Sequence, residues 1–108
     1  MAAVVILTTV NSGHDAEHFA RELVGKRLAA CVNIIPGVQS VYRWRENVEC
    51  DSEFLLLIKT TEERVAALKL VLFDLHPYEV PEFVVLPVDR VEEPYASWLS
   101  QQVTPDGE

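Results

Sequence analysis

Residues 38–60 read VQSVYRWRENVECDSEFLLLIKT, and this stretch decides the fold. Residues 38–45 alternate in the manner of a β-strand, and residues 48–60 form a second strand that ends in the apolar run FLLLI. Between them, Glu46-Asn47 fits a two-residue turn, in which Asn47 tolerates a positive φ. The stretch therefore predicts a long antiparallel hairpin.

This hairpin is longer than the domain that supports it. A compact domain of this length has a radius of gyration of ~13 Å and a diameter of roughly 33 Å. The 13 residues of the second strand span ~43 Å at ~3.3 Å each. We therefore expect the hairpin to project, and its exposed edges to pair in a closed ring of identical chains. The alternative is a hairpin folded back on its own domain, with Pro36-Gly37 as the hinge.

The predicted turn also determines which side chains meet across the hairpin. It places Cys50 opposite Arg43. It aligns three carboxylates with two aromatic rings and a hydroxyl: Glu49 with Trp44, Asp51 with Tyr42, and Glu53 with Ser40. Like charges at a spacing of two residues repel one another and attract a cation. The alternative is a solvated strand face that resists aggregation.

Outside the hairpin, helices and strands alternate. Two capping boxes, Ser12 with Asp15 and Thr60 with Glu63, predict the starts of two helices. The predicted order is strand 3–10, helix 12–25, strand 30–45 with a bend or bulge at Pro36-Gly37, strand 48–60, a helix that ends at Pro77, strand 82–88, a helix from Pro94, and a frayed tail over 104–108. This order predicts a ferredoxin-like α+β sandwich, an antiparallel sheet with helices on one face.

Composition and charge limit the classes of function. The 108 residues are 49% hydrophobic, which supports one globular domain over residues 1–108. Seventeen acidic residues against nine basic ones give a net charge of −8. We therefore expect cations as partners, and neither nucleic acid nor a membrane surface. Cys31 and Cys50 make no disulfide framework, and the amino terminus lacks the basic region of a signal peptide, so we expect free thiols and a cytoplasmic location.

Two histidines in the first predicted helix are candidate metal ligands. His14 and His18 stand four residues apart, so a helix places both imidazoles on one side, with Asp15 and Glu17 near them. Paired imidazoles bind zinc or copper. The alternative is a set of ordinary polar residues on a solvated first turn.

A second candidate site lies at the end of the second predicted helix. The segment from His76 to Glu82 holds one imidazole, one phenol and the carboxylates of Glu79 and Glu82, and two prolines fix its backbone. This set suits a metal or a small ligand, whereas the alternative for His76 is a helix cap. Cys31 is a further candidate ligand, although its apolar strand also suits a buried and inert thiol.

The sequence carries no strong catalytic motif. It has no G-x-S-x-G, no glycine-rich phosphate loop and no zinc-type cysteine pair. Residues 37–43 are similar to the phosphate loop of acylphosphatases, but they follow the first helix, and Ser40 replaces a glycine of that loop. We therefore predict a protein that is not an enzyme.

Five segments together resemble the CutA family of divalent-cation tolerance proteins. They are LAACVNIIPG at 28–37, Tyr42-x-Trp44, LIKTT at 57–61, HPYEVPE at 76–82 and PYASWL at 94–99. The resemblance runs from the first strand to the last helix, over about 95 residues. It implies a ferredoxin-like homotrimer related in architecture to PII signalling proteins, divalent metal binding with copper above all, and a link to metal tolerance.

The resemblance also implies a metal ligand at His76, with Glu79 and Glu82 as helpers. Members credited with copper binding are expected to have cysteine at the Thr8 position and a second histidine at the Leu75 position, and this chain has neither. The family's turn glycine is replaced by Glu46.

Two hypotheses follow. In the first, a cytoplasmic homotrimer binds divalent cations such as Cu²⁺ or Zn²⁺ at clefts between subunits, with no obligatory cofactor. In the second, a PII-like trimer binds a small metabolite in those clefts and contacts a partner protein through its projecting loops.

Overall fold

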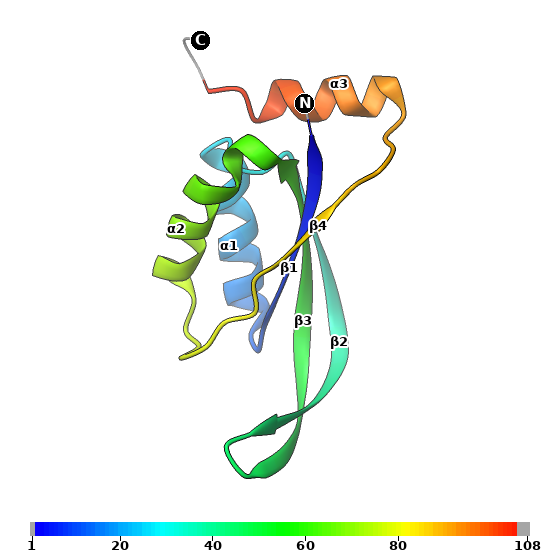
Figure 1. Cartoon of the computed structure of the whole chain (residues 1–108). Helices are drawn as coiled ribbons and strands as arrows, with labels where there is room; N and C mark the ends of the chain where they lie inside the picture. Colours follow the sequence, from blue (N-terminus) through cyan, green and yellow to red (C-terminus); the bar gives the residue numbers. More distant parts are fainter. Residues whose placement is uncertain (1, 106–108) are drawn as a thin grey trace.

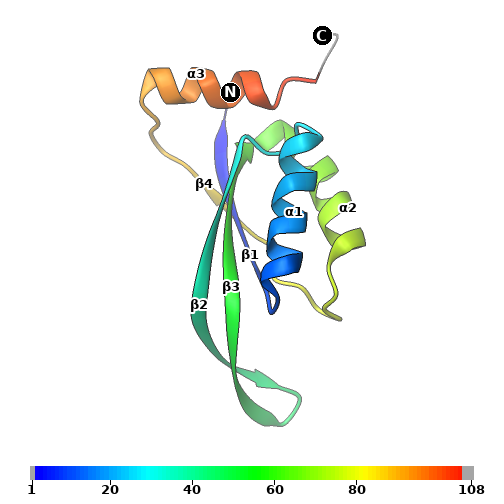
Figure 2. The same ribbon diagram turned by 180° about the vertical axis from the view of Figure 1, so that it is seen from behind.

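The computed structural model describes residues 2–105 as an α+β fold with a four-stranded antiparallel sheet. The strands are ordered β2-β3-β1-β4, which is the predicted ferredoxin-like topology. Helices α1 and α2 cover one face of the sheet, and α3 lies across the end opposite the hairpin tip (Figures 1 and 2). The element bounds are β1 Ala3–Val10, α1 Gly13–Gly25, β2 Cys31–Trp44, β3 Asn47–Thr61, a 3₁₀ turn Glu62–Arg64, α2 Val65–Leu75, β4 Val84–Pro87 and α3 Glu93–Gln102.

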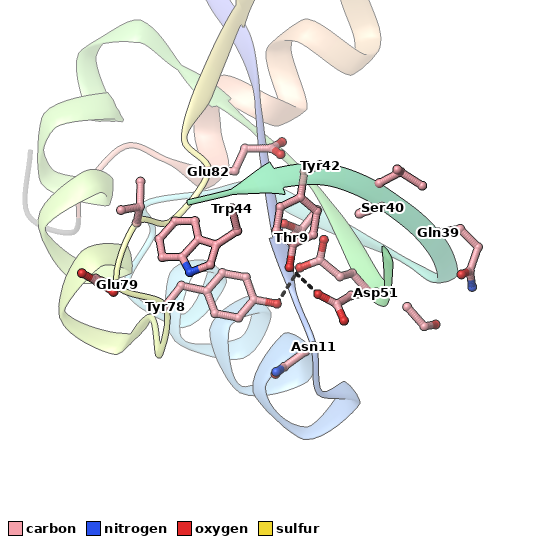
Figure 3. A pocket seen from close by; sticks show the side chains of 14 residues that line it. Thr9, Asn11, Gln39, Ser40, Tyr42, Trp44, Asp51, Tyr78, Glu79 and Glu82 are labelled. Atoms are coloured by element: carbon pink, nitrogen blue, oxygen red, sulfur yellow. Dashed lines mark hydrogen bonds between the residues drawn. The ribbon is translucent and has the colours of Figure 1, made fainter. Parts of the chain in front are cut away.

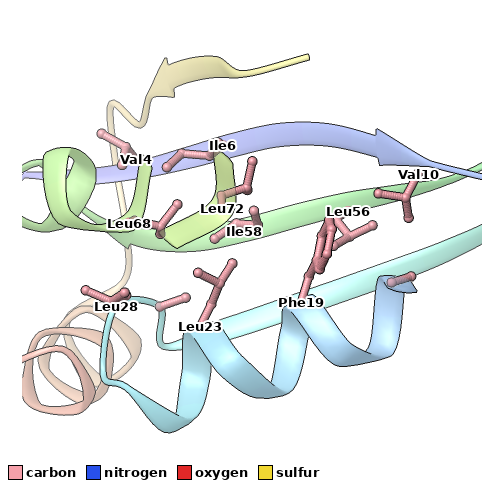
Figure 4. Close-up of a cluster of buried hydrophobic side chains, with 12 residues drawn as sticks. Val4, Ile6, Val10, Phe19, Leu23, Leu28, Leu56, Ile58, Leu68 and Leu72 are labelled. Atoms are coloured by element: carbon pink, nitrogen blue, oxygen red, sulfur yellow. The ribbon is translucent and has the colours of Figure 1, made fainter. Parts of the chain in front are cut away.

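The core lies between the sheet and the first two helices. Alternate strand residues point to opposite faces, and β1 and β3 turn their even-numbered residues toward the helices. The core side chains are apolar and almost completely buried: Val4, Ile6, Val10, Leu56 and Ile58 from the sheet, and Ala16, Phe19, Leu23, Leu68 and Leu72 from the helices (Figure 4). The core thus fixes which face of each strand remains for function.

The two predicted capping boxes have different outcomes. Ser12 caps α1 as predicted, and its Oγ accepts a hydrogen bond from the backbone N–H of Asp15 at 3.3 Å. The box at Thr60 is wrong. Thr60 is a buried strand residue whose hydroxyl donates to the carbonyl of Leu28 at 2.6 Å, so it cannot cap a helix. A short 3₁₀ turn precedes α2 instead, and Pro77 ends that helix as predicted.

The hairpin projects beyond the body, as its length predicted. The molecule measures 48 × 26 × 21 Å, and the tip of the hairpin curls under the end of the sheet (Figure 1). The turn lies one residue earlier than predicted, at Arg45-Glu46, where Arg45 takes the positive φ of 58°. The predicted register is therefore wrong by two residues, and Cys50 lies opposite Val41 and not Arg43.

The remaining boundaries differ from the prediction in small ways. The predicted bulge is present, because the pairing of β2 with β3 shifts between Ile35 and Val38, with Gly37 at a φ of 71°. β4 is shorter than the predicted strand 82–88. Of the predicted frayed tail, residues 106–108 lie outside the described part, whereas the hydroxyl of Thr104 donates to the carbonyl of Ser100 at 2.8 Å. No helix within residues 2–105 is long and apolar enough to cross a membrane.

Candidate functional site

A cavity of about 780 Å³ lies between the curled hairpin and the segment that follows α2 (Figure 3). Acidic and aromatic side chains dominate its lining: Tyr42, Trp44, Asp51, Glu53, Tyr78, Glu79 and Glu82, with polar Thr9, Asn11, Gln39, Ser40 and Ser52 and apolar Val41 and Val80. Thr9, Asp51 and Glu53 are odd-numbered strand residues, so the cavity opens on the sheet face that the helices leave uncovered.

Two hydrogen bonds between a phenol and a carboxylate organise the cavity. The hydroxyl of Tyr78 donates to Glu53 Oε2 at 2.5 Å, and the hydroxyl of Tyr42 donates to Asp51 Oδ2. Burial and the hydrogen bond to Glu53 raise the pKa of Tyr78 above its ordinary value. The hydrogen bond to Asp51 raises the pKa of Tyr42 to about 12. Both phenols therefore stay protonated at neutral pH and hold the carboxylates in place.

The other two carboxylates sit in the segment that closes the cavity. Burial and the nearby charge of Glu53 raise the pKa of Glu82. Glu79 faces Arg45 at the hairpin tip, with 3.5 Å between Oε2 and Nη2. The cavity therefore concentrates negative charge, which a cation would neutralise.

His76 lies behind the cavity and is buried, with both ring nitrogens in hydrogen bonds. Its Nδ1 accepts from the backbone N–H of Tyr78 at 3.2 Å, so Nε2 carries the hydrogen and donates to the carbonyl of Thr9 at 3.0 Å. The hydroxyl of Thr8 lies 3.3 Å from Nε2, and the ring packs against Phe19 and Tyr78. Burial lowers the pKa of His76, which favours the neutral ring. The structure thus gives His76 a structural role that any metal would have to displace.

The donor groups fit a divalent cation unequally. The cavity carboxylates offer oxygen ligands, which suit Mg²⁺, Mn²⁺ or Ca²⁺, whereas Cu²⁺ or Zn²⁺ at His76 must replace one of its two hydrogen bonds. Within residues 2–105, no group of three or more His, Cys, Asp or Glu side chains is arranged to hold a metal ion. A cation on a single chain would therefore have at most two of these side chains as ligands, with water completing its shell.

The remaining sequence candidates lie apart from the cavity. His14 and His18 are exposed on α1. Cys31 begins β2 opposite Lys59 and is half-buried, with its Sγ 3.9 Å from Asn33 Oδ1, so the interpretation of Cys31 as a buried thiol is wrong. Cys31 and Cys50 are both free, as predicted.

Sequence reasoning included the phenol of Tyr78 in the candidate segment, but it gave neither tyrosine a role as a site residue. It placed Tyr42 beside the carboxylates of Glu49, Asp51 and Glu53, which form an acidic stripe. It did not connect Tyr78 with Glu53, which is 25 residues away. The alternation of aromatic and acidic residues on one hairpin face was the available signal for Tyr42. No local pattern could reveal the contact of Tyr78, because it depends on how the chain returns after α2.

Comparison with known proteins identifies the family. The family model described as "CutA1 divalent ion tolerance protein" matches residues 4–102. The chain belongs to the CutA family. A CutA protein of Thermus thermophilus is 48% identical over 97 residues, which are 90% of this chain and 94% of that protein. Its solved structure has a TM-score of 0.91 and 46% identity, and the match covers 94% of this chain and 99% of that one.

Other CutA relatives differ in length and in described location. The mouse protein is 48% identical over 86 residues, which are 80% of this chain but 49% of the mouse protein. This chain thus spans about half of that relative. A CutA structure from Archaeoglobus fulgidus is described as a periplasmic divalent cation tolerance protein, with 31% identity, a TM-score of 0.91, and coverage of 94% of this chain and 99% of that one.

Proposed function

We propose that this chain acts in divalent-cation tolerance as a homotrimer that binds cations in its acidic cavity and catalyses no reaction. The observation that carries the proposal is a cavity with four carboxylates, in a chain whose net charge is −8. The electric field of these negative charges raises the local concentration of cations and repels anions. Family membership supports the same direction, because the related proteins are described by divalent-cation tolerance.

The trimer is proposed because the open sheet face is apolar. Ile35, Val84 and Leu86 point to this face, and each exposes 40–44% of its surface. On α3, Tyr95 and Trp98 each expose 40%. Large apolar side chains exposed on one sheet face suit a protein interface, and a closed ring of copies would cover them without leaving an open end. The cavity opens on the same face, so the copies would meet at its rim.

The proposed ligands are Glu79 and Glu82, which close the cavity, together with His76 as the nitrogen ligand. Glu82 gains most from a cation, because its raised pKa reflects burial beside the charge of Glu53. Cu²⁺ or Zn²⁺ at His76 would require release of the bond from the Tyr78 N–H or to the Thr9 carbonyl. The two free thiols favour a reducing compartment such as the cytoplasm.

Cation titration of charge-neutral variants tests the proposal. In calorimetry with Mn²⁺, we expect Glu79→Gln/Glu82→Gln to weaken binding by about tenfold, since removing a nearby charge costs ~1 kcal/mol or more. Glu62→Gln is the matched control, because Glu62 is also an exposed carboxylate but lies outside the cavity. Unchanged Mn²⁺ binding in the double variant would remove the cavity as the site.

Two further measurements test the nitrogen ligand and the assembly. A Cu²⁺ site in the cavity that persists unchanged in His76→Ala would remove His76 from the ligand set, and His76→Gln guards against loss of the fold. Sedimentation equilibrium at micromolar concentration should give three times the chain mass of 12.2 kDa. A stable single-chain mass would contradict the trimer.

A further inference from the structure

Two imidazoles, those of His14 and His18, are exposed to solvent on one face of α1. The buried side chains of this helix are Ala16, Phe19 and Leu23, which lie on one side at 100° per residue. His14 and His18 fall on the opposite side, within about 40° of each other on the helical wheel, and both are exposed. Within residues 2–105, no hydrogen bond, ion pair or ring contact is recorded for either imidazole, in contrast to His76.

The spacing of this pair suits chelation. Side chains at i and i+4 of a helix are neighbours, with about 5–6 Å between their Cβ atoms. Zinc proteases use two histidines at this spacing on one helix to bind their metal. Neutral imidazole is a good ligand for Cu²⁺, Ni²⁺ and Zn²⁺ and a poor one for Mg²⁺ and Ca²⁺. The pair therefore selects a different group of metals from the carboxylate cavity.

The surrounding charges permit a bound cation. The amino terminus of a helix disfavours positive charge, and Arg21 lies on the same face. The Nε of Arg21 is paired with Glu17 Oε2 at 2.8 Å, which offsets its charge. Asp15 adds a carboxylate in the first turn, whereas the charge of Glu22, one turn after His18, is offset by Lys26, with 3.9 Å between Oε1 and Nζ.

We infer that His14 and His18 form a second divalent-metal site, made of two imidazoles and water, for Cu²⁺, Ni²⁺ or Zn²⁺. Helix α1, which carries the pair, covers one face of the sheet (Figure 2), whereas the apolar side chains of the proposed trimer contact on β2 and β4 point to the other face. The site therefore stays accessible in the trimer. It does not depend on the cavity, so either site can fail without the other.

A paramagnetic titration of the unmodified protein gives the first test. The chain has only three histidines, so each ring signal can be assigned by single substitution. With substoichiometric Cu²⁺, we expect the proton signals of His14 and His18 to broaden together, before that of His76. Broadening of His76 first, or of all three at the same metal concentration, would overturn the inference.

A matched pair of variants tests the chelate geometry. We expect His14→Gln/His18→Gln to weaken Ni²⁺ binding by about a hundredfold, because the second imidazole acts at high effective concentration. The control is His18→Gln/Arg21→His, which keeps three histidines but separates the pair by about 10 Å along the helix. It should bind as weakly as the double variant.

Wild-type Ni²⁺ affinity in either variant would overturn the site. Mn²⁺ binding separates this failure from failure of the cavity, because the histidine variants should leave Mn²⁺ affinity unchanged. All substituted residues are exposed, and circular dichroism confirms that the variants fold.

Discussion

Strand β3 builds two regions that contrast with each other. In the body it places Leu56 and Ile58 beneath the helices with no exposed surface, whereas near the hairpin tip it leaves 67% of Val48 exposed. The body is held by apolar burial, which is the dominant favourable contribution to folding. The hairpin is held mainly by backbone pairing between two strands, by the bond between Tyr42 and Asp51, and by two polar contacts with the segment after α2, Tyr78 with Glu53 and Glu79 with Arg45. A two-stranded ribbon of this kind is marginal alone, and the homotrimer proposed above would support it.

The largest expected effect is a loss of stability in the body of the fold, the core between the sheet and helices α1 and α2. The matching change in the hairpin should have little effect. Phe19→Ala should lower the free energy of unfolding by about 3–5 kcal/mol, because Phe19 is 1% exposed and its loss leaves a cavity in the core. Val41→Ala, at a position that is 67% exposed, should change it by less than about 0.5 kcal/mol in the single chain. Urea denaturation measures both. Equal losses would show that the hairpin is as tightly packed as the body.

The second prediction compares the two phenol–carboxylate pairs. Tyr78→Phe should destabilise the fold by about 1–3 kcal/mol, because it leaves the buried carboxylate of Glu53 without its donor. Tyr42→Phe should have no measurable effect on stability, because Tyr42 and Asp51 are exposed and water replaces the bond. Thermal unfolding of the two variants at one pH tests this. A larger loss of stability for Tyr42→Phe than for Tyr78→Phe would contradict the view that the hairpin contributes less to stability than the body.

The smallest expected effect depends on pH and concerns the body. Burial lowers the pKa of His76, so the unfolded chain takes up a proton at a higher pH than the folded chain. Stability should therefore fall as the pH decreases below the ordinary histidine value of about 6.5, until the lowered pKa is passed. Melting temperatures between pH 7.5 and pH 5 measure this fall.

The control for the pH effect is His76→Gln. Its amide can hydrogen-bond to Thr9 and Tyr78 but does not titrate, so the variant should lose part of the pH dependence. An identical pH profile in the variant would mean that other groups cause the fall. Carboxylates contribute at lower pH, so only the difference between the two profiles carries the result.

The fold was predictable because its signals are local. The alternation in residues 38–60, the cap at Ser12 and the stop at Pro77 each act within a few residues, and the structure confirms all three. Thr60 shows the limit of such reasoning. Its spacing to Glu63 matched a capping box, but a hydrogen bond to a carbonyl 32 residues away keeps it in the strand.

The site was predictable only in part. The acidic stripe and the segment from His76 to Glu82 were both identified from sequence, and the structure brings them to one cavity. The burial of His76 could not be predicted from the sequence, because it depends on contacts with Thr9 and Phe19, which are distant in sequence. The turn was misplaced because Asn47 is the better residue for a positive φ, yet Arg45 takes that conformation.

The bulge beside Gly37 has a consequence for the chemistry of the cavity. Between Ile35 and Val38, β2 advances three residues while β3 advances two, from Leu55 to Glu53. The even-numbered side chains of β2 therefore change sides of the ribbon beyond this point, and Tyr42 joins the carboxylates. If the intact strands paired in step through this point, without the bulge, Arg43 would face the carboxylates in place of Tyr42. One additional residue in β2 thus decides whether a phenol or a guanidinium faces the carboxylates. A phenol leaves their negative charge available to a cation, whereas a guanidinium would neutralise it.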